Sequence, residues 1–584
     1  MASFVEIGAA ISPLVIVAIL LIGFLWPAER AMPVAWVVAG VAAFVIWDMP
    51  VDWITAASIR GGLAAIEILW IVFGALVLLY TLMNSGAVDR INEGFASISE
   101  DRRVQIVLLA FFVATFIEGV AGFGTPAAVV APLLLALGFP ALAAVIAALI
   151  GHAIATVFGA VGTPIIVGYQ QPLESVEPEI VAEGMSVAGY SASAAGWAAV
   201  FNGLLGILMP LFAVGMITYF FGEQRSLAPI WGVLPLCLFS GAAFAVPYML
   251  TAWFIGPELP SLFAAMVGGA IVVAVLRAGY LEPSDTWTFP PRNEWPEYWV
   301  GTIEPGSDET TADGSGSMSL LRAWSPYVVL VIVLIGTRVI EPVADTLQGG
   351  PIATVSTPIG DFSFGPIIEW SGILGTELSG AVEWAYVPGT WLLLSALIAI
   401  PIFSMNSEDI VDAWREAGSK IISPLIALVF VIAMVEIMLE TNAHVQAGVT
   451  AAEATPDGSM IVILADATAA TIGPAYPMIA PIVGALGAFI AGSITVSNIT
   501  FSAFQFEVAR SLDMPTQILV GAQSVGGAIG NVIAIHNVIA ALATVGLVGK
   551  TGRVIRLNLI PVAYYLIAGG ILATVSVYLF PAVF

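Results

Sequence analysis

The chain has 584 residues, of which 59% are hydrophobic and only 10% are charged, and its mean hydropathy is +1.00. Globular proteins carry about a quarter charged residues, so this composition excludes a soluble protein and predicts an integral membrane protein. The formal net charge is -25, from 41 acidic and 16 basic residues. This charge excludes a nucleic-acid partner, and we interpret it as adaptation to a high-salt milieu.

Apolar runs recur from end to end and predict an all-α polytopic protein with about 12 transmembrane helices, since a span needs about 20 mainly apolar residues. The first run, Ile11 to Trp26, follows no basic residue and precedes no small-residue cleavage site, so we interpret it as a span rather than a signal peptide. The predicted spans are 8–26, 31–47, 62–82, 190–221, 227–254, 261–277, 325–340, 389–405, 421–440 and 557–582, with two composite blocks at 104–167 and 477–549.

A polar, acidic stretch at 278–322 predicts a solvated cytoplasmic linker between an N-terminal half, 1–277, and a C-terminal half, 323–584. A second polar stretch, 341–388, contains short β-type runs to which the sequence assigns no fold. The single cysteine, Cys237, lies in an apolar run, which excludes an internal disulfide and predicts a small buried hydrophobe.

The placement of Lys and Arg predicts the orientation, because cytoplasmic loops are enriched in them. Loops at 48–52, 168–189 and 441–458 contain neither residue. Placing the basic loops inside gives a consistent alternation with both termini outside. The basic loops contain Arg30, Arg90 with Arg102 and Arg103, Arg225, Arg277 to Arg322, Arg415 with Lys420, and Lys550 with Arg553 and Arg556.

The two composite blocks resemble each other, which indicates an internal repeat. The first block runs from a basic loop to an acidic loop and the second runs the opposite way, so the copies are predicted to be inverted. Inverted repeats with a midplane site are an architecture of secondary transporters. The matching positions are Phe116-Ile-Glu-Gly119 with Phe489-Ile-Ala-Gly492, Pro140 with Pro515, Val145 with Val520, Ala147 with Ala522, and Gly151, Ala153, Ile154 and Val157 with Gly526, Ala528, Ile529 and Val532.

Each block also interrupts itself twice, which predicts a re-entrant hairpin followed by a broken helix. The predicted tips are Gly122 to Pro126 and Ser493 to Asn498, and the predicted breaks are Gly162 to Pro164 and His536-Asn537. Helix N-termini at such breaks present unpaired N–H groups, which suits a carboxylate. The alternative is that the small residues only allow close helix packing. Two flanking segments, 87–101 and 459–475, are interpreted as interfacial helices.

Residues 116–168 are similar to the L-lactate permease family, through Glu118-Gly-x-Ala-Gly-Phe-Gly-x-Pro126 and Phe158-Gly-Ala-x-Gly-x-Pro164. The second block matches in Gly492-Ser-x-Thr-x-Ser-Asn498, Gly526-Gly527 and Gly546 to Lys550. The resemblance implies proton-coupled uptake of lactate, and of glycolate, across the plasma membrane by an elevator-type carrier of the ion-transporter superfamily. It also implies a homodimer. The chain departs from the family pattern at Asn531, at Ala534-Ile535 and at His152.

Candidate proton-coupling residues are the intramembrane acid Glu118 and two histidines near the predicted breaks, His152 and His536. For each, the alternative is a structural, hydrogen-bonded or packed side chain. Short polar residues at the breaks are candidates for binding a carboxylate and an α-hydroxyl, or for capping half-helices. The candidate substrate-binding residues are Gly124, Thr125, Thr163, Ser497, Asn498, Thr500, Asn531 and Asn537.

Further intramembrane acids, Glu67 and Glu436, could serve coupling or scaffold pairing, and Glu507 lies one turn from Arg510 and can pair with it. We expect no enzyme, metal site or cofactor, because G-x-S-x-G, Walker, HExxH and paired-His motifs are missing from the sequence. The coupling ion is expected to be H⁺, with Na⁺ as the alternative in a carrier for another organic anion. An anion channel is a weaker alternative.

Overall fold

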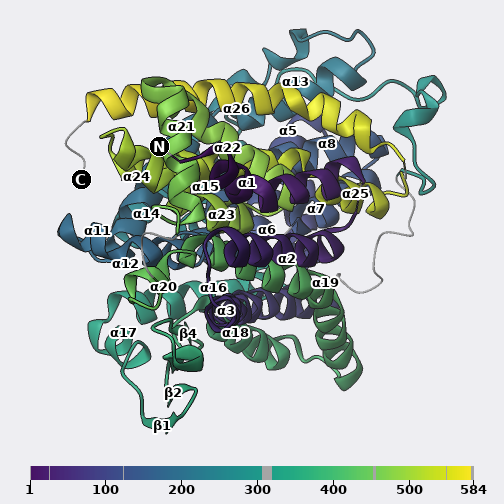
Figure 1. Cartoon of the computed structure of the whole chain (residues 1–584). Coiled ribbons are helices and arrows are strands. Elements are labelled where there is room, and N and C mark those ends of the chain that lie inside the picture. The colour runs from purple at the N-terminus through teal and green to yellow at the C-terminus, as the bar shows by residue number, and fades with distance from the viewer. Residues whose placement is uncertain are drawn as a thin grey trace.

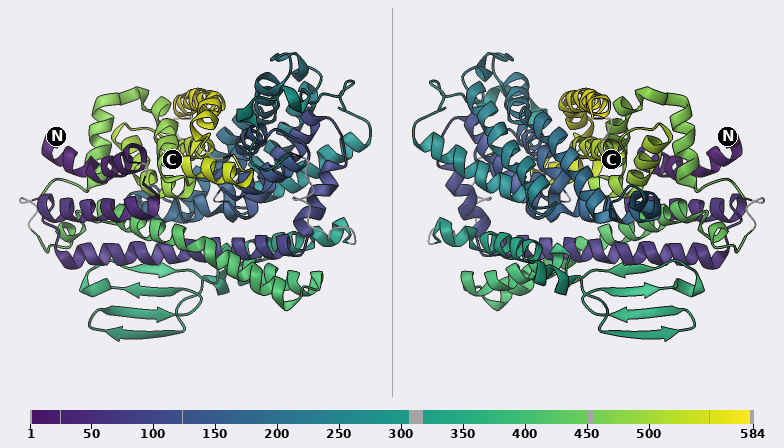
Figure 2. Two further views of the ribbon diagram at one scale, coloured as in Figure 1. Left: turned by 90° about the vertical axis from the view of Figure 1, so that its right-hand side faces the viewer. Right: turned by 90° about the vertical axis from the view of Figure 1, so that its left-hand side faces the viewer.

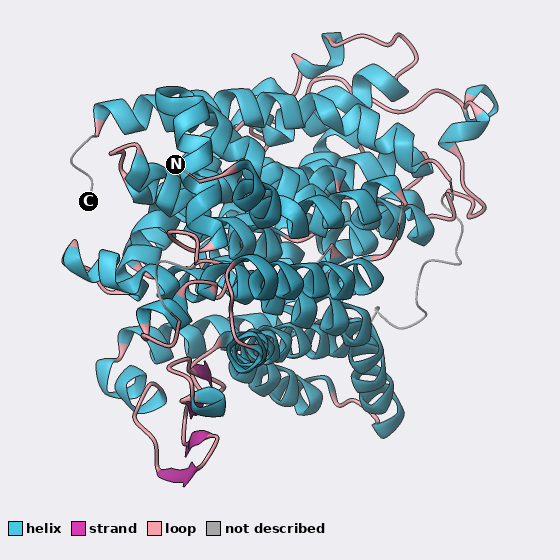
Figure 3. Ribbon diagram, in the orientation of Figure 1, coloured by secondary structure: helices cyan, strands magenta, loops and turns pink. Residues whose placement is uncertain are grey.

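The computed structural model describes residues 2–24, 26–122, 124–305, 318–450, 455–547 and 549–580. Over these ranges the chain is mostly helical, as the apolar pattern predicts (Figure 3). Among the described residues, eleven helices are long and apolar enough to cross a membrane, or thirteen if each of two bent pairs counts as one span. The prediction of a polytopic helical membrane protein with about 12 spans is therefore confirmed.

The helices of the N-terminal half alternate long apolar segments with short polar ones. In chain order they are α1 (Phe4–Ala18), α2 (Ala28–Ile46), α3 (Val51–Asn84), α4 (Ala87–Ala96), α5 (Arg102–Gln105), α6 (Ala114–Val120), α7 (Thr125–Ala136), α8 (Ala141–Gly151), α9 (Gly159–Ile166), α10 (Gln170–Leu173), α11 (Glu177–Ala182), α12 (Val187–Gly206), α13 (Met209–Phe221), α14 (Leu234–Phe254) and α15 (Pro260–Arg277). Short π or 3-10 segments continue some of them, including η2 (Ile106–Val113), η3 (Ala153–Phe158) and η4 (Glu174–Val176).

The C-terminal half adds eleven helices and four strands within the described residues. They are α16 (Leu320–Val339), α17 (Glu341–Leu347), β1 (Ala353–Thr357), β2 (Gly360–Phe364), β3 (Ile368–Ser371), β4 (Gly380–Val382), α18 (Pro388–Phe403), α19 (Ser407–Glu440), α20 (Ala443–Gln446), α21 (Met460–Ile472), α22 (Tyr476–Ala491), α23 (Ile494–Ser511), α24 (Thr516–Gly530), α25 (Ile535–Thr544) and α26 (Thr551–Leu579), with the 3-10 segment η13 (Asn531–Ile533) after α24.

One set of helices forms the lower part of the molecule in Figure 1 and is named here the α3 group. It consists of α2, α3, α16, α18 and α19 together with the four-stranded sheet, and α3 packs along both α18 and α19. Helices α3 and α19 have 34 residues each and exceed the predicted spans 62–82 and 421–440. Charged turns precede their apolar runs, and in α19 the side chain of Asn406 caps the helix by accepting the N–H of Asp409.

The second set, named here the hairpin group, lies above the α3 group in Figure 1. It contains the two blocks that resemble each other, α6 to α9 with η2 and η3, and α22 to α25 with η13. Helices α12, α15 and α26 pack on them, and Phe244 and Tyr248 of α14 contact Phe111 and Phe158. The described helix from Arg102 to Val120 is completely buried, because α8, α13 and α15 cover its first segments. The two blocks therefore sit at the centre of this group.

The polar stretch 341–388 contains α17 and the only strands among the described residues. The sheet is antiparallel with the order β1-β2-β3-β4, and Val355 of β1 lies opposite Phe362 of β2. It projects beyond α3 at the edge of the molecule (Figure 2). Its inner end is anchored on α3, where Gly380 packs against Leu63 and the N–H of Glu383 donates to Oε2 of Glu67.

Of the two segments predicted as interfacial helices, 87–101 and 459–475, only the first forms a short separate helix. Residues 87–96 form a short amphipathic helix, α4, as predicted. Residues 460–472, in contrast, form α21, which continues through a 3-10 turn into α22 as one apolar segment, Met460–Ala491, long enough to span a membrane. Asp466 and Gly473 lower the local hydropathy but do not end the apolar segment. The prediction that 459–475 form a separate interfacial helix is therefore wrong.

The first part of the predicted linker is packed rather than solvated. Trp299 and Phe289 are buried, and the N–H of Thr302 donates to the carbonyl of Gly546 at the end of the second block. Aromatic residues at 287–299 provide the apolar surface that holds this segment down. The acidic part at 306–317 lies outside the described residues.

The loops that are rich in Lys and Arg contact one another. Nη1 and Nη2 of Arg103 donate to the carbonyls of Pro229 and Asp285, and the Arg553 guanidinium lies 3.7 Å from the centre of the Tyr298 ring. Loops without Lys or Arg meet elsewhere, around two neighbouring pockets. Residues within 170–174 and 379–388 help to line one of them, and residues within 174–178, 377–379 and 440–446 help to line the other. The two sets of loops are thus gathered separately, as the predicted alternation requires.

Candidate functional site

Two helix hairpins turn at glycines near the centre of the hairpin group. Helix α6 ends at Val120 and α7 begins at Thr125, with Gly122 and Gly124 between them at φ +59° and +77°. Helix α22 ends at Ala491 and is followed by Gly492 at φ +64°, and Ser493 caps α23 by accepting the N–H of Val496. Glycine favours these left-handed conformations because it has no Cβ. The second tip is shorter than predicted, since Ser497 and Asn498 already lie inside α23.

The helix that follows each hairpin is broken, as predicted. Ala141–Gly151 and Ala153–Ile166 are bent by 45°, and Thr516–Ile533 and Ile535–Thr544 by 42°. The first break extends from the bend at His152 to a left-handed run, in which Ala160, Val161 and Gly162 follow one another at φ +43°, +53° and +80°. Left-handed conformations cost L residues about 1–2 kcal/mol each, and such strain is found mainly at functional sites.

Both breaks begin N-terminal to the predicted positions, and the first begins already at His152. Thr163 and Pro164 are already in the continuing helix, and the second break falls at Ala534, with helix α25 resuming before His536 and Asn537. Ala534 has an extended ψ of 125° and interrupts the second helix, whereas the polar pair His536-Asn537 after it is helical.

Side-chain amides from neighbouring helices satisfy backbone carbonyls that the breaks leave free. Asn202 of α12 donates to the carbonyl of Ile154 at 2.5 Å, and Asn558 of α26 donates to the carbonyl of Val532 at 3.1 Å. Ser261 donates to Ala155 at 2.6 Å. Because lipid cannot solvate a free carbonyl, these contacts make the broken helices tolerable inside a membrane.

The hairpin tips and helix breaks of both blocks surround one small cavity. Gly124 of the first tip lies against Asn537 of the second block, where a Cβ would be 2.6 Å from Oδ1. Helix α25 packs on α7, and α23 packs on α9. The cavity between them is small: the volume open to the centre of a water molecule is only about 10 Å³, which is enough for about one water. The cavity is lined by Glu118, Gly122, Gly159, Ala160, Pro164, Gly492, Ser493, Ile494, Thr495 and Asn531.

Glu118 is the acidic residue of this cavity. It sits at the end of α6 with 2% of its surface exposed, and its carboxylate lies against Gly159, where a Cβ would be 2.4 Å from Oε1. Its Oε2 is buried without a hydrogen-bond partner. A buried carboxyl oxygen with no partner is costly, so the structure holds a polar group at this position that the surrounding protein does not satisfy.

Two predicted amides lie together at the second break. Asn531 lines the cavity, and Nδ2 of Asn537 donates to Oδ1 of Asn531 and, at 3.4 Å, to the carbonyl of Gly492. The pair therefore joins the second hairpin tip to the second break.

Asn498 joins the two blocks instead of lining the cavity. Its Nδ2 donates to the carbonyl of Pro164 at 2.9 Å and to Oγ of Ser524 at 2.7 Å. Oγ of the same Ser524 accepts from the hydroxyl of Tyr169 at 2.6 Å. Tyr169 and Ser524 are functional-site neighbours that the sequence analysis missed, because their 355-residue separation leaves no local signal.

Four further predicted substrate-binding residues donate their hydroxyl hydrogen bonds to nearby backbone carbonyls. Thr125 donates to Gly122, Thr163 to Ala160 and Thr500 to Val496, each along its own segment. Ser497 donates to the carbonyl of Gly484 on the facing helix of its hairpin. In this arrangement the four side chains shape the tips and breaks and do not point their hydroxyls into the cavity. Ser493 and Thr495 line it instead.

The two candidate histidines lie outside the cavity lining. His152 ends α8, is fully buried and places Nδ1 2.8 Å from the carbonyl of Ala148. His536 is exposed, and its ring lies directly over Gly492, where a Cβ would be 1.3 Å from Cε1. The third histidine of the sequence, His444, follows α19 and is also buried.

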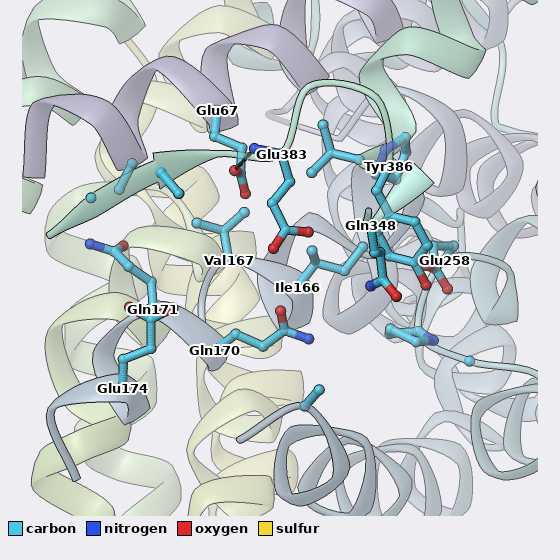
Figure 4. Close-up of a pocket in the computed structure, with 18 of the residues that line it drawn as sticks. Glu67, Ile166, Val167, Gln170, Gln171, Glu174, Glu258, Gln348, Glu383 and Tyr386 are labelled. Atoms are coloured by element: carbon cyan, nitrogen blue, oxygen red, sulfur yellow. Dashed lines mark hydrogen bonds between the residues drawn. The ribbon is translucent and has the colours of Figure 1, made fainter. Parts of the chain in front are cut away.

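A second, much larger pocket of about 500 Å³ lies beside the first break, since Ile166 and Val167 form part of its wall. In Figure 4, Glu67 and Glu383 line one wall, and Gln170, Gln171 and Glu174 the other. Burial raises the pKa of Glu383, while Arg338 acts in the opposite direction. Burial likewise raises the pKa of Glu174, and Arg60 opposes this shift.

The sequence predictions for the intramembrane acids are met in part. Glu436 faces Arg60 at 3.4 Å, which is scaffold pairing, and Glu507 faces Arg510 at 3.6 Å. Cys237 is fully buried, as predicted.

Spanning helices, two hairpin tips and two broken helices around a polar cavity define a class, that of polytopic membrane transport proteins. The chain matches the L-lactate permease family over residues 7–580. It is 26% identical to the L-lactate permease of Bacillus subtilis over 89% of this chain and 87% of that protein, and 26% identical to the glycolate permease GlcA of Escherichia coli over 92% and 90%. Among solved structures it is similar to the YdaH transporter of Alcanivorax borkumensis, with 13% identity, a TM-score of 0.41 and coverage of 89% of this chain and 87% of that chain.

The chain belongs to the L-lactate permease family. It is therefore a transporter and not an enzyme, and a multi-pass protein of the plasma membrane.

Proposed function

We propose that this protein carries L-lactate and related small 2-hydroxy monocarboxylates such as glycolate across the membrane together with protons. The observation that carries the proposal is the buried carboxyl of Glu118, which has an unpaired oxygen at the cavity where both tips and both breaks meet. The names of the relatives, L-lactate permease and glycolate permease, support the substrate class.

The cavity offers donors for a carboxylate. First-turn N–H groups have no acceptor within their own helix, and Ser493 takes that of Val496. The N–H groups of Ile494 and Thr495, which line the cavity, are then left for a ligand at the positive end of the helix dipole. The amide of Asn531 is a neutral partner for the α-hydroxyl.

The proton would travel on Glu118. A proton on this buried carboxyl would remove its charge, so that a substrate anion arriving beside it would meet no like charge. Binding of the anion and binding of the proton would thus assist each other, which is the physical basis of symport.

Alternating access, through two inverted repeats that move as an elevator, is part of the proposal. Supporting it, the cavity is too small for lactate, so the tips must separate to admit substrate. The first block begins beside the Arg103 loops and ends at the large pocket, whereas the second ends at Gly546, beside the basic loops. Opposite orientation of the two blocks accounts for this placement.

The test is uptake by the purified protein in liposomes that contain a pH-sensitive dye, with an inward lactate gradient and no sodium. Proton-coupled transport predicts internal acidification that saturates with lactate concentration and drives accumulation when a pH gradient is imposed. Uptake that requires Na⁺ would assign the coupling to sodium instead. Flux that never accumulates lactate against its gradient would indicate a channel and would contradict the proposal.

A homodimer completes the proposal, since a carrier whose parts move needs a fixed frame in the membrane. Sizing of the protein in a mild detergent by native electrophoresis is expected to give twice the mass of the 60.8 kDa chain, and a monomer at all concentrations would contradict it.

A further inference from the structure

The α3 group and the hairpin group are joined by a small set of charged and polar contacts on one face. Helix α19 also packs on α23 and α3 on α9, and Phe116 of α6 lies edge to face against Trp324 and Tyr327 of α16. The charged contacts lie around the large pocket of Figure 4, where side chains of one group reach carboxylates of the other. The function proposed above leaves these contacts without a role.

The first contact is made by Arg338, at the end of α16 in the α3 group. Its Nε lies 2.5 Å from Oε1 of Glu258, in the loop between α14 and α15 of the hairpin group, and both side chains are more than nine-tenths buried. The guanidinium also stacks on the Tyr386 ring at 3.8 Å and donates to the Tyr386 carbonyl at 2.7 Å. Arg338 is therefore fixed on its own group and extends one bond across the boundary.

The loop that Glu258 belongs to presses on the first helix break. Gly162, at φ +80°, lies so close to this loop that a Cβ would be 2.3 Å from the carbonyl of Pro257. The Arg338–Glu258 pair thus holds the loop, and through it the strained break, against the α3 group.

The second contact is made by Arg60 of α3. Its Nη1 lies 2.7 Å from Glu440 on α19, in the same group, and its Nη2 lies 3.0 Å from Glu174, which follows α9 and α10. Beside it, Nε2 of Gln171 donates to Oε1 of Glu436 at 2.6 Å. Arg60 again has an anchor in its own group, and it makes one bond to η4, the short segment that follows α9 and α10 on the hairpin-group side.

Each of the two guanidiniums already has its charge compensated by a carboxylate of the protein. Every nitrogen that can donate from Arg338 is bonded to Glu258, Thr337 or Tyr386. All three nitrogens of the Arg60 guanidinium face carboxylates. A carboxylate from solution would have to displace a glutamate that is held within the protein, so the pairs are better suited to hold two bodies together.

We propose that Arg338–Glu258 and Arg60–Glu174 form a latch between the α3 group and the hairpin group, which stabilises the closed arrangement seen here and opens in every transport cycle. The idea rests on the proposed alternating-access function. Its consequence is that Arg338, Glu258, Arg60 and Glu174 are positioning residues, which set the rate of transport without touching the substrate.

Cross-linking tests the latch, because the chain has a single cysteine. In a Cys237→Ala background, Arg338→Cys with Glu258→Cys is joined in liposomes by a short bis-methanethiosulfonate reagent, which binds each thiol through a disulfide that a reductant cleaves. We expect lactate counterflow to fall at least tenfold on cross-linking and to recover on reduction. The control is Trp70→Cys with Thr390→Cys, two residues of the α3 group whose side chains are 2.9 Å apart, where cross-linking is expected to leave counterflow unchanged.

The outcomes separate the latch from the proposed function. Unchanged counterflow in the cross-linked 338/258 protein would overturn the latch while leaving lactate transport intact. Absence of lactate flux in the Cys237→Ala protein, before any reagent, would count against the proposed function itself.

A second measurement does not require an active variant. Gel mobility gives the cross-linking yield of the 338/258 pair with and without saturating lactate, and opening of the latch predicts a yield that changes at least twofold. Equal yields in both conditions would overturn the latch.

Neutral variants give a third, independent readout. Arg338→Gln with Glu258→Gln removes both charges together, since removing only one leaves a buried charge unpaired. It is expected to change the counterflow rate at least threefold with the half-saturating lactate concentration unchanged. The matched control is Glu179→Gln, which breaks the exposed Arg510 pair at 3.2 Å. A double variant with the rate of the control would contradict the proposal.

Discussion

At the scale of single residues, the carboxyl of Glu118 is the group on which coupling depends. Glu118→Gln keeps the shape of the side chain but cannot release a proton, so we expect lactate-driven acidification of liposomes to fall to background while lactate exchange persists within a few-fold. Dye-reported acidification and isotope counterflow in the same vesicles measure the two. Full acidification in the variant would exclude Glu118 as the proton carrier.

The control for Glu118 is another buried acid of the hairpin group. Glu507 lies in α23 and is paired with Arg510, so its charge is already compensated. Glu507→Gln is expected to retain proton coupling, which would separate loss of the Glu118 proton from a general effect of losing an acid.

Gly492 is the second residue whose replacement gives a defined result. The backbone at Gly492 has φ +64°, which disfavours any residue with a Cβ, and a Cβ at this position would also collide with the His536 ring. We expect Gly492→Ala to cost about 1–2 kcal/mol from the left-handed conformation alone, and more from the collision, which lowers the melting temperature in detergent. The control, Gly418→Ala, lies in α19 with open space around it and is expected to be neutral or slightly stabilising. Equal melting temperatures of the two variants would contradict this account of the tip.

At the scale of elements, the broken helices depend on amides supplied by their neighbours. Asn202→Ala and Asn558→Ala each leave a buried carbonyl unsatisfied, which costs about 1–3 kcal/mol. We expect both variants to melt earlier and to transport more slowly, as measured by thermal unfolding and initial uptake rates. Asn84→Ala, at a partly buried helix end, is the control and should have the smaller effect. Wild-type behaviour of both variants would mean that water or lipid satisfies these carbonyls.

At the scale of the whole molecule, the net charge of -25 opposes compaction through self-repulsion. Salt screens this repulsion, with a Debye length of about 3 Å at 1 M against about 10 Å at 0.1 M. We expect the melting temperature to fall when salt is lowered from molar to tenth-molar, equally in NaCl and KCl. Dependence on sodium alone would indicate a specific ion site rather than screening.

The sequence by itself determined the membrane class, most of the spans, the positions of both hairpins and of the second break to within about a turn, the left-handed end of the first break, and the family. These features follow from local properties, namely runs of apolar residues and glycines that permit left-handed backbone. Glu118 could be identified as a candidate because an acid inside an apolar run is rare. The ends of α3 and α19 could not be predicted, since capping and packing extend those helices beyond their apolar runs.

Only the tertiary structure decided which polar residues meet. Asn531 lines the cavity while Ser497 and Thr500 bond within their own hairpin, although all three look alike in the sequence. Contacts such as Asn498 with Pro164 and Arg338 with Glu258 join residues 334 and 80 positions apart. Local sequence determines where a helix begins, bends and ends, but the direction of a side chain depends on the helix packed against it, and that packing arises only when the whole chain has folded.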